Sequence, residues 1–79
     1  MNNIQDFCTY LEVKIKCKVT YNIDELQRRI TFYIKLKELD FSLTYKIDYY
    51  KFFHFISYTD LYILIKTCLD NELKYYIYK

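Results

Sequence analysis

Several residue types are missing from this chain of 79 residues, and their absence excludes some classes of site. There is no glycine, which excludes phosphate-cradling glycine loops and the dinucleotide-binding fingerprint. Glycine also permits the tightest two-residue hairpin loops, so we expect the turns of this chain to be longer. Proline, alanine and tryptophan are absent too. An AT-rich coding sequence would explain this bias without any reference to function.

The chain also lacks a disulfide framework and a run of apolar residues long enough to cross a membrane. Its three cysteines are an odd number without a close pair, as is typical of a reducing compartment: Cys8, Cys17 and Cys68. The longest uncharged apolar stretch covers residues 52–59, whereas a membrane span needs about 20 residues. Residues 1–10 have no basic region followed by an apolar core, so no secretory signal is expected. We therefore expect a cytoplasmic protein without membrane contact, in the cytoplasm of a host cell if a phage encodes it.

Catalytic and metal-binding patterns are missing as well. His54 is the only histidine, and Phe53 and Phe55 flank it, which favours a packed structural role over acid–base chemistry. A Cys–His nucleophile or a zinc site would require cysteines beside His54, and no two cysteines have the short spacing of a structural zinc site. We predict that the protein is not an enzyme, with no catalytic residues, no cofactor and no metal.

The chain is rich in aromatic and other apolar residues, which are 53% of the total and include eleven Tyr and six Phe. Its length predicts a single domain over residues 1–79. Near the N-terminus, four apolar residues share the spacing of one helix face: Ile4, Phe7, Cys8 and Leu11. With Asn2 or Asn3 as the cap, this spacing predicts a helix over residues 3–12.

Three segments then alternate between apolar and polar residues, a period of two that is typical of half-buried strands. They cover residues 13–23, 29–37 and 41–47. The polar segments 24–27 and 38–40 separate them. Two short connections between alternating segments predict an antiparallel meander of three strands.

In the C-terminal third, the sequence predicts one helix and leaves the secondary structure of one segment open. Residues 48–58 fit either a helix capped by Asp48 or a further aromatic strand. A second helical face follows, and it predicts a helix from Thr59 or Asp60, as the cap, to about residue 76. The fold class is therefore α+β, a three-stranded antiparallel meander with helices on one face, in the order α-β-β-β-(α or β)-α. The predicted core is Ile15, Val19, Phe32, Ile34, Leu43, Leu61, Leu64 and Ile65.

The strand residues that point away from the helices carry a concentration of positive charge. The residues chosen as the candidate polyanion- or partner-binding site are Lys14, Lys16, Lys18, Arg29, Tyr33, Lys35, Lys37 and Lys46. No acidic residue lies within the three alternating segments. This face is either a solvated surface whose lysines prevent edge-to-edge aggregation, or a docking surface for a polyanion.

A second candidate partner surface is aromatic, because a domain this small cannot bury all of its tyrosines. It consists of Tyr58, Tyr62, Tyr75 and Tyr76. Exposed tyrosine is favoured at protein interfaces, although AT-rich coding also enriches tyrosine.

These features together predict a small non-enzymatic binding protein. The preferred hypothesis is an inhibitor or modulator from a phage or other mobile element, similar in action to an anti-CRISPR protein. It would block a nucleic-acid-handling host complex by contacting a larger host protein or ribonucleoprotein. The alternative is a direct DNA- or RNA-binding protein that uses the basic sheet face. A homodimer formed through exposed aromatic residues is a further hypothesis.

Overall fold

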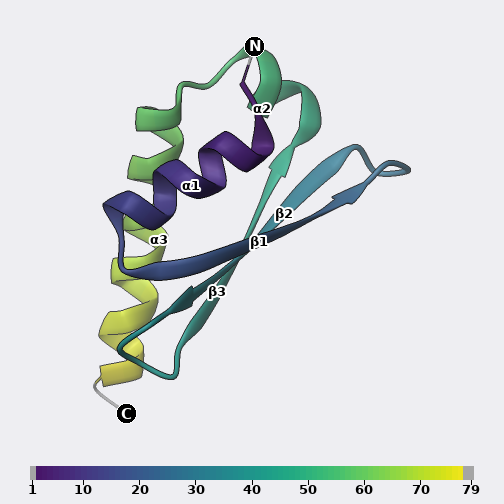
Figure 1. The fold of residues 1–79 in the computed structure, drawn as a ribbon. Coiled ribbons are helices and arrows are strands. Elements are labelled where there is room, and N and C mark those ends of the chain that lie inside the picture. The colour runs from purple at the N-terminus through teal and green to yellow at the C-terminus, as the bar shows by residue number, and fades with distance from the viewer. Residues whose placement is uncertain (1, 78–79) are drawn as a thin grey trace.

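The computed structural model describes residues 2–77 of the chain, with the side chains of residues 2–75. The elements along the chain are α1 (Ile4–Lys14), β1 (Cys17–Asp24), β2 (Arg29–Leu36), β3 (Ser42–Asp48), α2 (Tyr49–His54) and α3 (Tyr58–Ile77). The strands form one antiparallel sheet in the order β1-β2-β3. Helices α1 and α3 lie side by side on one face of this sheet (Figure 1). The α+β meander predicted from the sequence is therefore confirmed.

The two faces of the sheet follow from the alternation of side chains. On the inner face, Val19 lies opposite Ile34, which in turn lies opposite Leu43, and all three are buried. Tyr21 and Ile23 have the same inward parity but remain 41% and 36% exposed. The reason is visible in Figure 1, where the end of the β1–β2 hairpin extends beyond the helices. The opposite, outer face of the sheet has no helix over it.

The core is centred on Phe7 of α1, which is completely buried. Its ring centroid lies 5.3 Å from that of Phe32 and 5.9 Å from that of Phe52, both with edge-to-face geometry. Tyr58 adds a third ring at 5.5 Å. Residues from α1, β2, α2 and α3 therefore meet at one aromatic contact, which holds the helices against the sheet.

The predicted boundary between the first helix and the first strand is wrong. Val13 and Lys14 belong to α1, and β1 begins only at Cys17. The backbone N–H of Ile15 still donates to the carbonyl of Leu11 at 2.9 Å, so the helical hydrogen bonding continues past the expected end. Two alternating residues at a boundary fit either period, and the helix already formed extends through them.

The ambiguous segment 48–58 is helical from Tyr49 to His54, and its last residue begins α3. Asp48 accepts a hydrogen bond from the N–H of Lys51 at 3.1 Å and caps α2, as the helical alternative required. The cap expected for the last helix is wrong, because Ser57 rather than Thr59 or Asp60 performs this role: its hydroxyl accepts from the N–H of Asp60 at 3.1 Å. Asn3 caps α1 by accepting from the N–H of Asp6 at 3.0 Å, as one of the two predicted caps.

The predicted core is confirmed except at two positions. Leu64 is 41% exposed, because α3 buries the face defined by Leu61, Ile65 and Leu69, spaced four residues apart. Ile15 is only partly buried, since it follows the end of α1 instead of lying within a strand.

Candidate binding surfaces

Four lysines form one compact group on the outer face of the sheet, which we call the lysine block: Lys16, Lys18, Lys35 and Lys37. Lys18 lies directly opposite Lys35 in the β1–β2 register. The backbone N–H of Lys37 donates to the carbonyl of Lys16 at 3.1 Å, which extends this register beyond the strand ends. The two lysine pairs are therefore successive rows of the same sheet face. All four side chains are exposed.

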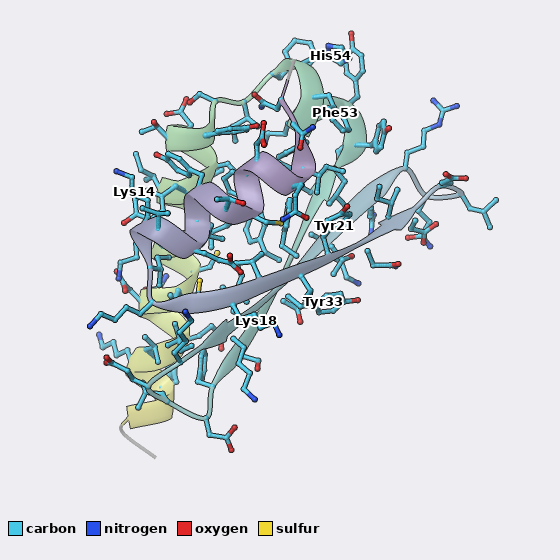
Figure 2. The ribbon with its side chains drawn as sticks, in the orientation of Figure 1. Lys14, Lys18, Tyr21, Tyr33, Phe53 and His54 are labelled. Carbon is cyan, nitrogen blue, oxygen red and sulfur yellow. The ribbon has the colours of Figure 1, made fainter. Side chains whose placement is uncertain are left out.

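A shallow hollow of about 340 Å³ adjoins the lysine block on the outer face. Its lining combines two lysines, one tyrosine, two residues with aliphatic hydroxyl groups and one isoleucine: Lys18, Lys35, Tyr33, Thr20, Ser42 and Ile34. Figure 2 shows Lys18 and Tyr33 on the side of β1 opposite to α1. None of these lining residues carries a negative charge, so the hollow has a positive potential. Thr20 was not among the predicted site residues, although its place in the alternation already assigned it to this face.

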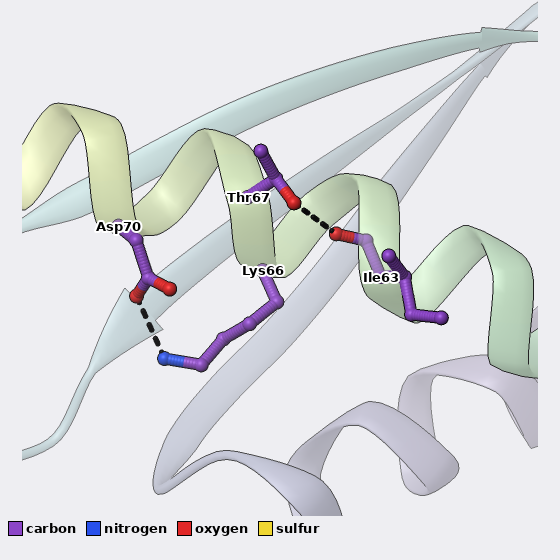
Figure 3. Close-up of polar contacts among 4 residues, drawn as sticks. All are labelled: Ile63, Lys66, Thr67 and Asp70. Atoms are coloured by element: carbon purple, nitrogen blue, oxygen red, sulfur yellow. Dashed lines mark hydrogen bonds and ion pairs between the residues drawn. The ribbon is translucent and has the colours of Figure 1, made fainter.

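Ion pairs of the lysine block are few among the described residues. Lys16 is the only member with an ion pair among the described residues, and its Nζ lies 3.4 Å from Oε1 of Glu38. Both side chains are largely exposed, so this pair is weak and is readily exchanged for another anion. Lys66 on α3 forms a shorter ion pair than Lys16 does: its Nζ lies 2.7 Å from Oδ1 of Asp70, one helical turn away (Figure 3).

Three of the predicted basic residues are not part of this group. The assignment of Lys14 to the sheet face is wrong, because it lies in the last turn of α1, with its Nζ 5.6 Å from the centre of the Tyr10 ring. Arg29 does lie on β2, but Asp24 and Asp48 are its partners on the two neighbouring strands. These two carboxylates are the last residues of β1 and β3, one residue beyond the alternating segments that contain no acid.

Lys46 remains on the outer face but lies apart from the lysine block. Its row consists of Asn22, Thr31 and Lys46, and the neutral row of Thr20, Tyr33 and Thr44 separates it from Lys18 and Lys35. Of the eight predicted residues, the structure thus brings together the four lysines of the block with Tyr33 beside them.

The three described members of the predicted aromatic surface do not form one patch, although Tyr58 and Tyr62 both pack on the ring of Tyr10. Tyr58 is partly buried, and its hydroxyl donates to the carbonyl of Asn3 at 3.0 Å and accepts from the N–H of the same residue at 2.9 Å. Tyr62 packs edge-to-face on Tyr10, with 6.3 Å between centroids. Tyr75 is exposed on α3. The side chain of Tyr76 lies outside the described residues.

Aromatic rings are concentrated instead around α2, in what we call the α2 aromatic cluster: Tyr49, Tyr50, Phe53, His54 and Phe55. All are exposed except Phe53, which is partly buried against the core. Phe55 is 72% exposed and Tyr50 is 60% exposed. Their ring centroids are 5.2 Å apart, and the ring of His54 lies 4.6 Å from that of Tyr50. Figure 2 shows Phe53 and His54 at the end of the molecule where α2 lies. The aromatic segment that left the secondary structure ambiguous was the sequence signal for this cluster.

A second hollow, of about 550 Å³, lies between the β1–β2 turn and α2. It is lined by Ile23, Glu25, Arg28, Asp48, Tyr49 and Tyr50. Arg28 has a φ of 54°, a left-handed conformation that costs a non-glycine residue about 1–2 kcal/mol. Its carbonyl accepts from the N–H of Tyr49 at 2.8 Å, which joins the turn to the start of α2. This hydrogen bond compensates in part for the backbone strain.

Two of the three cysteine thiols, those of Cys8 and Cys17, are buried. Burial raises the pKa of the Cys8 thiol to about 11, and the nearby Glu12 carboxylate adds to this effect. Burial and Glu12 also raise the pKa of the Cys17 thiol, so both thiols stay protonated and weakly nucleophilic near neutral pH. Over the described residues, no group of three or more His, Cys, Asp or Glu side chains is placed to hold a metal ion.

No protein-family model, curated protein or solved structure matches this chain. The arguments about function therefore depend on the two surfaces alone. Within residues 2–77, no helix is both long enough and apolar enough to cross a membrane. The lysine block with its hollow is suited to phosphate groups, whereas the α2 aromatic cluster is suited to apolar contact with a protein.

Proposed function

We propose that this chain is a non-enzymatic binding protein that holds nucleic acid against the outer face of its sheet. The observation that supports this proposal is the lysine block beside the hollow at Tyr33. Lys18 and Lys35 are cross-strand neighbours, and like charges in this position destabilise a sheet. A phosphate backbone would relieve that repulsion, so the free energy of binding includes the removal of an unfavourable interaction.

The geometry also favours contacts to phosphate over contacts to base edges. Lysine binds phosphate as a point charge and carries little sequence information. Tyr33 offers one aromatic ring in the hollow, on which a base can stack without regard to its identity. We therefore propose binding that depends strongly on salt and weakly on sequence.

The test is a titration of labelled single-stranded and double-stranded DNA and RNA at about 50 mM and about 200 mM salt. In the double variant Lys18→Gln/Lys35→Gln, the magnitude of the slope of log K against log salt on duplex DNA should fall by about 0.9 for each phosphate that the protein no longer neutralises. The matched control is Lys51→Gln/Lys74→Gln, which removes the same charge from α2 and α3. Its slope should stay close to that of the wild type. Absence of binding at the lower salt concentration, or equal changes in both double variants, would overturn the proposal.

A second candidate function is supported by the α2 aromatic cluster. Large exposed rings such as those of Phe55 and Tyr50 are enriched where proteins meet. This favours a protein partner, such as a larger host protein or ribonucleoprotein that a phage-encoded inhibitor of the anti-CRISPR kind would block. In that case Tyr50→Ser/Phe55→Ser should abolish capture of the partner from a nuclease-treated lysate of the source cell. The variant Lys18→Gln/Lys35→Gln should capture it as the wild type does; the opposite pattern would reject this candidate.

A further inference from the structure

The free edge of β1 is blocked along only part of its length. The N–H of Val19 points away from β2 and donates to Oε2 of Glu12 at 2.9 Å. Antiparallel strands alternate between residues that bond to one neighbour and residues that bond to the other. Tyr21 and Ile23, two and four positions further on, therefore direct their N–H and C=O groups to the same free edge. Among the described residues, no group bonds to them there.

The hairpin end that carries this edge is accessible from the side. It extends beyond α1 and α3, and the side chains of Tyr21 and Ile23 are partly exposed on its inner face (Figure 1). Natural edge strands are usually protected by proline, a bulge or an inward-pointing charge. Residues 20–23 contain no proline and no charge, and the register with β2 runs without interruption from Cys17 to Asp24.

We infer that a second copy of this chain pairs antiparallel with this edge, about a two-fold axis at Asn22. Because Glu12 occupies the N–H of Val19, the pairing begins at Tyr21 and places it opposite Ile23 of the second copy. Each of these residues then gains both of its missing backbone partners. On the inner face, the exposed Tyr21 side chain covers the exposed Ile23 side chain of the other copy.

The charges along β1 make the edge complementary to itself. In this register, Thr20 lies opposite Asp24 of the second copy and can donate its hydroxyl proton to that carboxylate. Oδ1 of Asp24 already accepts from the N–H of Gln27 at 3.0 Å, so the second carboxylate oxygen receives the new bond. Lys18 lies one outer-face row further along and diagonal to the same carboxylate, within the reach of a lysine side chain. These interactions occur twice because of the two-fold axis.

Pairing of this kind joins the two sheets into one. Because inward residues meet inward residues, both outer faces lie on the same side of the joined sheet, and so do both lysine blocks. The inference does not depend on the proposed function, since the edge is complementary to itself whether or not the lysines bind nucleic acid.

The first test is sedimentation of the full chain over a range of concentrations up to about 1 mM, which detects even weak association. The wild type should change from monomer to dimer as concentration rises. Tyr21→Pro should remain monomeric, because proline removes the outward N–H while leaving the bonds to β2 intact, and edge strands tolerate it. The control Tyr21→Thr keeps the N–H and should still dimerise. A wild type that stays monomeric at every concentration, or a folded Tyr21→Pro variant that dimerises normally, would overturn the inference.

The second test needs no variant, so it remains decisive if Tyr21→Pro does not fold. Hydrogen exchange of the wild type should show the amides of Tyr21 and Ile23 becoming protected as protein concentration rises. The amides of Thr20 and Asn22 bond to β2 and should be protected at all concentrations. Exchange at Tyr21 and Ile23 that is independent of concentration would reject the pairing.

Discussion

Replacing Phe7 by alanine should remove a large part of the free energy of unfolding. The side chain is completely buried, and the rings of Phe32, Phe52 and Tyr58 lie within 5.9 Å of it, centroid to centroid. Deleting a buried phenylalanine side chain costs about 3–5 kcal/mol, because less apolar surface is buried and a cavity remains. At about 0.05–0.15 kcal/mol per residue, the whole domain has a stability of about 4–12 kcal/mol. The variant should therefore lose at least about a quarter of the free energy of unfolding.

Urea unfolding followed by circular dichroism would measure this change. Phe7→Leu keeps most of the apolar volume and should cost less than about 1.5 kcal/mol. Phe55→Ala removes the same side chain from a site that is 72% exposed and should change stability by less than about 0.5 kcal/mol. If Phe7→Ala cost less than about 1 kcal/mol, or no more than Phe55→Ala, the aromatic contact at Phe7 would not be the centre of the core.

Three further predictions concern the thiols and α3. Iodoacetamide at about pH 8 should modify Cys68 first, because the raised pKa values of Cys8 and Cys17 leave little thiolate at that pH. Mass spectrometry would measure the rate of modification of each cysteine, and equal rates for all three would contradict this prediction. The folded chain holds the Cys8 proton more tightly than the unfolded chain, so this thiol should lower stability as pH rises from 9.0 to about 11, and Cys8→Ala should lose that part of the pH dependence. On α3, Leu64→Ala should cost clearly less in chemical denaturation than Ile65→Ala, for which about 2–5 kcal/mol is expected at a fully buried position. Equal costs would show that α3 is rotated relative to the sheet.

Local periodicity was sufficient to predict the two longer helices and the three strands, but it left residues 48–58 open between helix and strand. A period near 3.6 around Phe7 and around Leu61 predicted the two main helices, and a period of two predicted three strands in their correct order. This succeeds because each element buries one face, and burial imposes its own spacing on the sequence. The predictions were wrong at boundaries, such as Val13 and Lys14, where too few residues remain to distinguish the two periods.

The composition of the candidate site could be predicted only in part. Alternation correctly placed Lys18, Tyr33 and Lys35 on the outer face. It could not show that Arg29 would have Asp24 and Asp48 as neighbours, because these residues come from three different strands. The α2 aromatic cluster was also missed, since its exposure depends on how much of α2 the core leaves uncovered.

The sequence by itself thus determined which side chains share a face of a helix or strand, because that depends only on the geometry of a single element. The tertiary structure decided which faces meet and how much of the sheet the helices cover. The lysine block exists because the hairpin register pairs Lys18 with Lys35 and Lys16 with Lys37. Tyr21 is exposed because the end of the hairpin extends beyond the helices that cover the sheet. The strand register and the part of the sheet that the helices cover depend on interactions between residues that are distant along the chain. These interactions form only when the whole chain packs.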